Sequence, residues 1–123
     1  MKKIICNSIE FVFVSEIESM TGELIILQFG YGWKKLDVTE KPVYGFDTKQ
    51  ANPGPVMEET VTAVTRYVKD AMLKTHSNFP VILRMKTDTD ETFYVGSIQY
   101  PVITEVSCDR IFDTYTFKSK STP

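Results

Sequence analysis

The sequence predicts an α+β fold, a mainly antiparallel β-sandwich or barrel with one flanking amphipathic helix, in a single domain over residues 1–123. Three observations predict it. Residues 79–117 contain three apolar runs separated by turn residues, residues 9–29 contain two strand-like runs, and residues 56–74 carry apolar side chains at helical spacing. A chain of 123 residues is long enough to bury a core of its own.

Residues 9–16 are rich in aromatic and β-branched types and predict a strand, and residues 23–29 predict a second one. The turn-forming residues Met20, Thr21 and Gly22 lie between them, so we expect a hairpin. Residues 23–29 are nearly all apolar, which favours burial on both faces of that strand. Residues 30–55 are expected to form an extended loop, with room for a short strand at 43–46.

Residues 50–55 (Gln-Ala-Asn-Pro-Gly-Pro) form the strongest break in the chain, and a helix is predicted after them, over residues 56–74. Its apolar positions recur every three or four residues, at Met57, Val61, Val64, Val68 and Ala71. Glu58 and Lys74 have the charges that suit the two ends of a helix. The helix is rich in β-branched residues, so it must be stabilised by packing against a sheet.

The C-terminal part, residues 79–117, predicts an antiparallel meander. Its strands are expected at 80–85, 93–102 and 111–117, and the acidic residues 88–91 form the first hairpin tip. Proline cannot donate a ladder hydrogen bond, so the pair Tyr100-Pro101 marks an edge, a bulge or a bend.

Composition excludes several classes of function. The net charge of −2 and the even spread of Lys and Arg predict no specific nucleic-acid partner. No apolar stretch approaches the roughly 20 residues of a membrane span, so no membrane partner is predicted. Only Ile4 and Ile5 follow the N-terminal lysines before polar residues begin, so we expect no secretory signal peptide.

No catalytic residue, metal ligand or cofactor site is predicted, and we expect the chain not to be an enzyme. Cys6, Cys108 and His76 are too few for a zinc site made of cysteine and histidine alone. We interpret the two cysteines as small buried thiols, with a disulfide between them left open. His76 is expected to terminate the helix, and residues 88–91 lack the glycine of a calcium-binding loop.

Four aromatic residues of the segment 30–55 are candidate interface anchors, because rigid aromatic side chains are favoured at protein interfaces. They are Tyr31, Trp33, Tyr44 and Phe46. The alternative is that this segment is an ordered loop that covers the chain's own core.

A run at residues 96–101 (Gly-Ser-Ile-Gln-Tyr-Pro), followed by the aromatic alternation of Phe112, Tyr115 and Phe117, resembles small structural proteins of bacteriophage tails. The resemblance covers residues 57–117 and the order of elements there. Tube-type subunits of that family are β-sandwiches with one flanking helix. The resemblance therefore implies a ring-forming subunit without a catalytic site, located in the virion or the host cytoplasm, whose partners are copies of itself and other virion or assembly proteins.

Two functional hypotheses follow. The first is a non-enzymatic structural or assembly protein that acts as a homo-oligomer, such as a phage virion or tail component. The second is a monomeric protein-binding module, an adaptor or inhibitor, that binds one partner through its aromatic loop.

Overall fold

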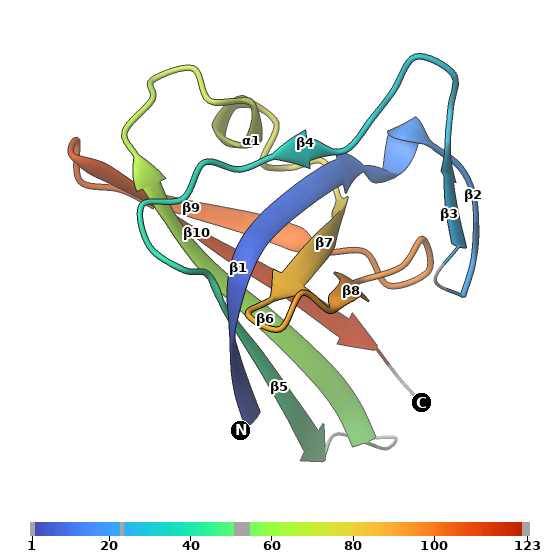
Figure 1. Cartoon of the computed structure of the whole chain (residues 1–123). Coiled ribbons are helices and arrows are strands. Elements are labelled where there is room, and N and C mark those ends of the chain that lie inside the picture. Colours follow the sequence, from blue (N-terminus) through green and yellow to red (C-terminus); the bar gives the residue numbers. More distant parts are fainter. Residues whose placement is uncertain (1, 23, 51–54, 122–123) are drawn as a thin grey trace.

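A curled antiparallel sheet forms most of the chain in the computed structural model, which describes residues 2–22, 24–50 and 55–121 (Figure 1). The strands of this sheet follow the order β8-β7-β1-β5-β6-β10-β9, and the short strand β4 pairs with β1. A separate hairpin of β2 and β3 lies beside it. The strands are β1 (Lys2–Phe13), β2 (Ile17–Thr21), β3 (Leu24–Leu27), β4 (Lys34–Lys35), β5 (Val43–Gln50), β6 (Pro55–Arg66), β7 (Val81–Thr87), β8 (Thr92–Val95), β9 (Ile103–Cys108) and β10 (Phe112–Ser121).

The sheet curls so that the start of β7 lies next to the residue that precedes β9. Val81, at the start of β7, donates a hydrogen bond of 3.0 Å to the carbonyl of Val102, and Val102 donates one of 2.9 Å in return. The predicted β-rich fold with a single helix is therefore confirmed. The helix, α1 (Met72–Thr75), is one turn long, and none of the helical segments in the described ranges has the length and apolar character needed to cross a membrane.

The core fills the inside of the curl. Most of its fully buried side chains come from β1, β6, β7 and β10, and they include Ile9, Val61, Leu83, Met85, Tyr115 and Phe117. The rings of Tyr115 and Phe117 stack with their centroids 6.1 Å apart. Apolar residues at alternate positions of these strands thus point to one face, as a half-buried sheet requires.

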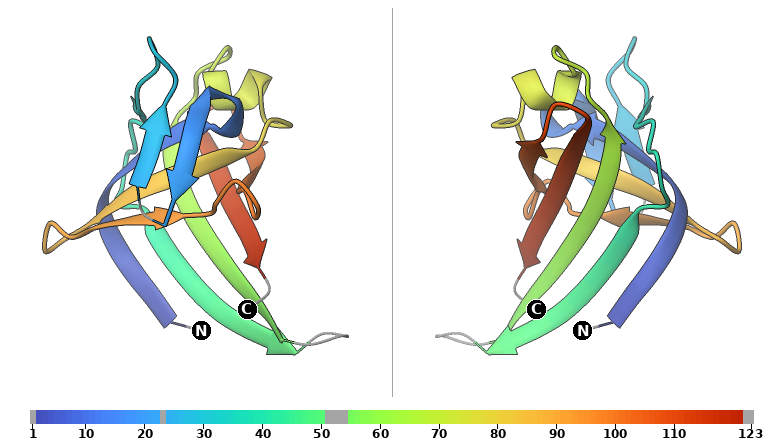
Figure 2. Two further views of the ribbon diagram at one scale, coloured as in Figure 1. Left: turned by 90° about the vertical axis from the view of Figure 1, so that its right-hand side faces the viewer. Right: turned by 90° about the vertical axis from the view of Figure 1, so that its left-hand side faces the viewer.

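The end of β1, at Phe11 and Val12, and the start of β7, at residues 81–83, are buried on both faces. Val12 and Ile82 point away from the main core and pack with Ile17, Ile25 and Leu27 of the β2–β3 hairpin. This hairpin lies over the outside of the sheet (Figure 2). This second layer explains the unbroken apolar run at the start of β7.

The predicted helix over residues 56–74 is wrong, because residues 55–66 form the central strand β6. β6 pairs with β5 on one side and with β10 on the other, along nearly its whole length. Val61, for example, lies opposite both Tyr44 and Phe117. Threonine and valine suit such a doubly paired strand better than a helix, because their branched side chains restrict helical rotamers.

The N-terminal hairpin is made by different strands from those predicted. β1 runs on to Phe13, and a 3-10 turn over residues 14–16 leads into β2, which pairs with β3. The turn at Gly22 is as expected, with a positive φ of 59°. The expected burial of residues 23–29 on both faces is wrong, because the side chains of Leu24 and Ile26 are 64% and 44% exposed.

The prediction of a C-terminal meander is only partly correct. β7 and β8 form the predicted hairpin around residues 88–91, but β8 does not pair with β9. The predicted strand 93–102 ends at Val95, and Gly96 turns the chain with a φ of 88°. A Cβ at Gly96 would lie 2.7 Å from the Cγ2 of Val102, so no larger residue fits there.

The segment 30–55 is not an extended loop. It contains β5, which pairs with both β1 and β6 inside the sheet. Of the predicted break at 50–55, residues 51–54 lie outside the described residues. Gln50 and Pro55 are paired with each other, so the break lies between two strands of a hairpin rather than between a sheet and a helix.

Candidate protein-interaction surface

Large apolar side chains are exposed at the end of the molecule that carries α1. We call this set the α1-end surface. It consists of Tyr31, Tyr67, Val68, Met72, Phe79, Ile111 and Phe112. Ile111 is 66% exposed and Val68 is 53% exposed. Exposed apolar side chains that gather at one end of a molecule are candidates for an interaction site.

Three separate parts of the chain build this surface. The N–H of Tyr67, just after β6, donates to the carbonyl of Ile111 in the β9–β10 turn at 3.0 Å. That turn is fixed by the carboxylate of Asp109, which accepts from the N–H groups of Ile111 and Phe112 at 2.9 and 2.7 Å. These hydrogen bonds lower the pKa of Asp109, with the bond from Phe112 contributing most.

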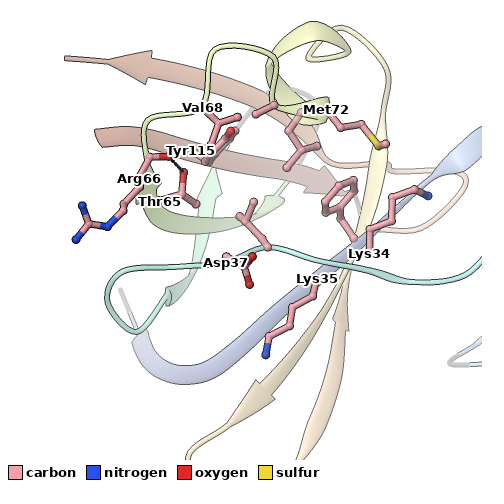
Figure 3. A pocket seen from close by; sticks show the side chains of 12 residues that line it. Lys34, Lys35, Asp37, Thr65, Arg66, Val68, Met72 and Tyr115 are labelled. Atoms are coloured by element: carbon pink, nitrogen blue, oxygen red, sulfur yellow. Dashed lines mark hydrogen bonds between the residues drawn. The ribbon is translucent and has the colours of Figure 1, made fainter. Parts of the chain in front are cut away.

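A groove of about 540 Å³ runs beside α1 (Figure 3). Its floor is apolar and includes Phe11, Leu36 and Leu73. Val68 and Met72 of the α1-end surface form part of its wall. The volume lies in the range typical of binding clefts, and the lining combines this apolar floor with charged residues.

A second groove, of about 300 Å³, adjoins the first, because Lys34 and Met72 line both of them. Tyr31, His76 and Phe79 also line this second groove. The α1-end surface therefore borders two adjoining grooves.

The charged residues around the grooves differ in whether they form an ion pair. Lys34 is held by Glu16, with Nζ–Oε distances of 2.7 and 2.9 Å. Lys35 and Arg66 are exposed at the mouth of the larger groove, where Asp37 is the acidic residue. The rim therefore has an excess of positive charge around an apolar floor.

A buried ion pair attaches α1 to the sheet. The carboxylate of Asp113 is fully buried on β10, and its Oδ2 lies 2.9 Å from Lys74 Nζ and accepts from the N–H of Val68 at 3.2 Å. Burial lowers the pKa of Lys74, but the hydrogen bond and the charge of Asp113 raise it more, so the net shift is upward. Lys74 also lies over the ring of Tyr67, 4.1 Å from its centroid.

The polar side chains that line the smaller groove bond to their own neighbours. His76 terminates α1, as predicted, and its Nδ1 lies 2.8 Å from Thr75 Oγ1. Glu16 in the same groove binds Lys34 and the N–H of Phe13, so it is not aligned on the histidine. Within the described ranges, His, Cys, Asp and Glu side chains form no group able to hold a metal ion.

The structure does not bring the four predicted anchors together. Tyr31 is exposed and lines the smaller groove. Trp33 is half-buried under the hairpin, against Val12 and Ile82. Tyr44 and Phe46 are half-buried on β5, and the hydroxyl of Tyr44 donates to Glu59 at 2.6 Å. Only Tyr31 belongs to the α1-end surface.

Trp33→Ala is expected to destabilise the fold by about 2 kcal/mol, below the 3–5 kcal/mol of a fully buried tryptophan. Its ring packs on Tyr94, with centroids 5.8 Å apart, and on the guanidinium of Arg84 at 4.6 Å. Arg84 in turn binds the carboxylate of Glu10 through two hydrogen bonds. Urea unfolding checks the prediction, with Trp33→Phe as the control that keeps an aromatic ring. An unchanged midpoint for the alanine variant would contradict a packing role.

Both cysteines are free thiols, but they differ in burial. Cys6 is buried, as expected, and burial raises the pKa of its thiol. Cys108 is exposed at the end of β9, so the expectation that both thiols are buried is wrong for Cys108.

Comparison of the chain with protein-family models, with curated proteins and with solved structures finds no significant match.

Proposed function

We propose that this chain is a non-enzymatic assembly protein that acts as a homo-oligomer, with a phage virion or tail component as its specific form. The observation that carries the oligomeric part is the α1-end surface, in which exposed apolar side chains border two adjoining grooves. Such a surface is stabilised when another protein covers it.

The tail or virion setting rests on the resemblance of residues 57–117. The flanking helix used in that comparison is strand β6, and the helix present is the single turn α1. Within the residues of the resemblance, β9 pairs with β10, and Tyr115 and Phe117 are buried with stacked rings. Other virion or assembly proteins are accordingly proposed as partners beside further copies of the chain.

Light scattering across a wide concentration range tests the proposal. The wild-type chain is expected to form a discrete oligomer or growing tubes, and the double variant Val68→Ser/Met72→Ser is expected to weaken association by about 10-fold or more, because it removes two apolar contacts. Ile5→Ser is the matched control, since Ile5 is 56% exposed but lies on the N-terminal half of β1, away from α1 (Figure 1).

A wild-type chain that stays monomeric at every concentration would overturn the homo-oligomer. That result would favour the monomeric binding module, with the same α1-end surface as its binding site for a different protein.

A further inference from the structure

A small polar pocket lies at the C-terminal end of β10, far from α1 (Figure 1). We call it the β10-end pocket. Its volume is about 250 Å³, and it is lined by Glu59, Gly96, Ser97, Tyr100, Ser119 and Ser121. Glu59 carries the only charge among these six residues, and most of the others contribute oxygen atoms.

Strand pairing places the carboxylate of this pocket beside a hydroxyl group. Glu59 on β6 lies directly opposite Ser119 on β10, and residues that are directly opposite on neighbouring strands point to the same face. Ser121 is two residues further along β10, so it points to that face as well. This is the inner face of the sheet, because Phe117, two residues before Ser119, is part of the core.

Two hydroxyl protons at the pocket are already used within the chain. The hydroxyl of Tyr44 donates to Oε2 of Glu59 at 2.6 Å. Burial, and after it the hydrogen bond to Glu59, raises the pKa of Tyr44, so this hydroxyl keeps its proton. The hydroxyl of Ser119 donates to the carbonyl of Tyr100 at 2.9 Å. A serine hydroxyl has one proton, so Ser119 has only lone pairs left for a ligand.

The loop that forms the other wall of the pocket is held in place. The N–H of Ser97 donates to the carbonyl of Tyr100 at 3.0 Å, and the N–H of Tyr100 donates to Oγ of Ser97 at 3.0 Å. The bond from Ser119 to the same carbonyl ties this loop to β10. The wall is therefore formed before any ligand binds, which lowers the ordering cost of binding.

The carboxylate of Glu59 has one oxygen to offer. Oε2 accepts from Tyr44, whereas no hydrogen bond or ion pair joins Oε1 to the described part of the chain. The side chain is half-buried. A carboxylate that is partly withdrawn from water is stabilised by a positively charged hydrogen-bond donor. The β10-end pocket thus presents a negative charge and acceptor oxygens.

We propose that the β10-end pocket binds a primary ammonium group, with Glu59 as its counter-ion and the hydroxyl oxygens of Ser119 and Ser121 as further acceptors. An ammonium group has three N–H donors and no acceptor, which matches a wall of acceptors. The volume is below the range of sites for drug-sized ligands, so a short alkylammonium is the right size. This inference does not depend on the proposed homo-oligomer.

A divalent metal ion matches the β10-end pocket less well. Calcium and magnesium take six or more oxygen ligands, usually with more than one carboxylate among the protein ligands. The pocket offers the carboxylate of Glu59 alone. In the ranges that the structure describes, His, Cys, Asp and Glu also form no group suited to a metal ion.

Titration with n-butylammonium chloride, followed by NMR of the backbone amides, tests the site. At constant ionic strength, we expect saturable shifts at Ser97, Ser119 and Ser121. n-Butanol has the same chain without the charge, and tetramethylammonium has the charge without an N–H donor. Each of these is expected to bind about 10-fold more weakly or worse, because it lacks the charge-assisted hydrogen bond.

Two matched variants test the role of Glu59. Glu59→Gln keeps an acceptor for Tyr44 but loses the charge, so the dissociation constant for n-butylammonium should rise by about 10-fold or more. Glu58→Gln is the control, since it removes the same charge from the neighbouring residue, which points to the other face and lies 4.0 Å from Lys120. Thermal melts show whether both variants remain folded.

The absence of saturable shifts with n-butylammonium would overturn the ammonium site. So would equal affinity for n-butanol, or an unchanged affinity in the Glu59→Gln variant. Light scattering of that variant then identifies the source of the ammonium group. Weaker self-association would assign it to a lysine of a second copy, and unchanged association would assign it to a ligand other than the chain itself.

Discussion

Val61→Asp is expected to prevent the chain from folding. Val61 is fully buried on β6, between Tyr44 on β5 and Phe117 on β10. An unpaired carboxylate there should reduce the free energy of unfolding by about 4 kcal/mol or more, out of the 5–15 kcal/mol typical of a domain. Circular dichroism should show loss of the cooperative thermal transition.

Val64→Asp is the matched control, and a loss of about 1 kcal/mol or less is expected. Val64 is half-exposed, and it points to the opposite face of β6 from Val61. In the helix predicted from the sequence, both valines would lie on one apolar stripe, and both aspartates would be equally damaging. If the two variants lost equal amounts of unfolding free energy, the assignment of β6 as a strand would therefore be contradicted.

The helix was predicted because apolar residues of β6 fit helical spacing. The true alternation runs through Val61, Ala63 and Thr65, all of which are buried. Alanine and threonine are weak markers of a buried face, so the period of two is hidden in the sequence. The pairing of β6 with two distant strands decides its conformation, and a single sequence does not show that pairing.

The positions of turns were predicted better than the pairing of strands. The hairpin tip at 88–91 and the turn at Gly22 depend on local residues, and both are correct. Whether β8 continues into β9 depends on the close approach of Gly96 to Val102, which lies six residues away and is fixed by Val81 on β7. Contacts of this kind are set by the curl of the sheet rather than by the local sequence.

Tyr31 is the one residue of the α1-end surface that the sequence predicted as an interface anchor. The rest of the α1-end surface comes from three segments that meet only in the fold, so their sequence positions do not indicate a common site. One sequence pattern could have indicated the buried ion pair between Asp113 and α1. Asp113 occupies an inward position in the alternation with Tyr115 and Phe117, and a buried carboxylate in such a place requires a cationic partner.

Lys74→Met is the second substitution with a large expected effect. It leaves the fully buried carboxylate of Asp113 without its cation, and within the described part of the chain the N–H of Val68 is the donor that remains. Breaking a buried pair by removing one partner is strongly destabilising, so the melting temperature should fall by about 10–20 °C. The double variant Lys74→Met/Asp113→Asn is the control, and it should recover part of the loss because no buried charge remains.

The pH dependence gives a second test of the same pair. In the wild-type chain the pKa of Lys74 is raised in the folded state, so the stability that the pair adds is fully present below the ordinary lysine value of about 10.4. It is lost as the pH rises through the higher folded pKa. The Lys74→Met variant should therefore lack the alkaline loss, and its deficit against the wild type should shrink at strongly alkaline pH. Thermal melts between neutral and strongly alkaline pH measure this effect. A deficit that does not change with pH would show that Lys74 acts by packing alone, and α1 would then be held on the sheet by Leu73 rather than by charge.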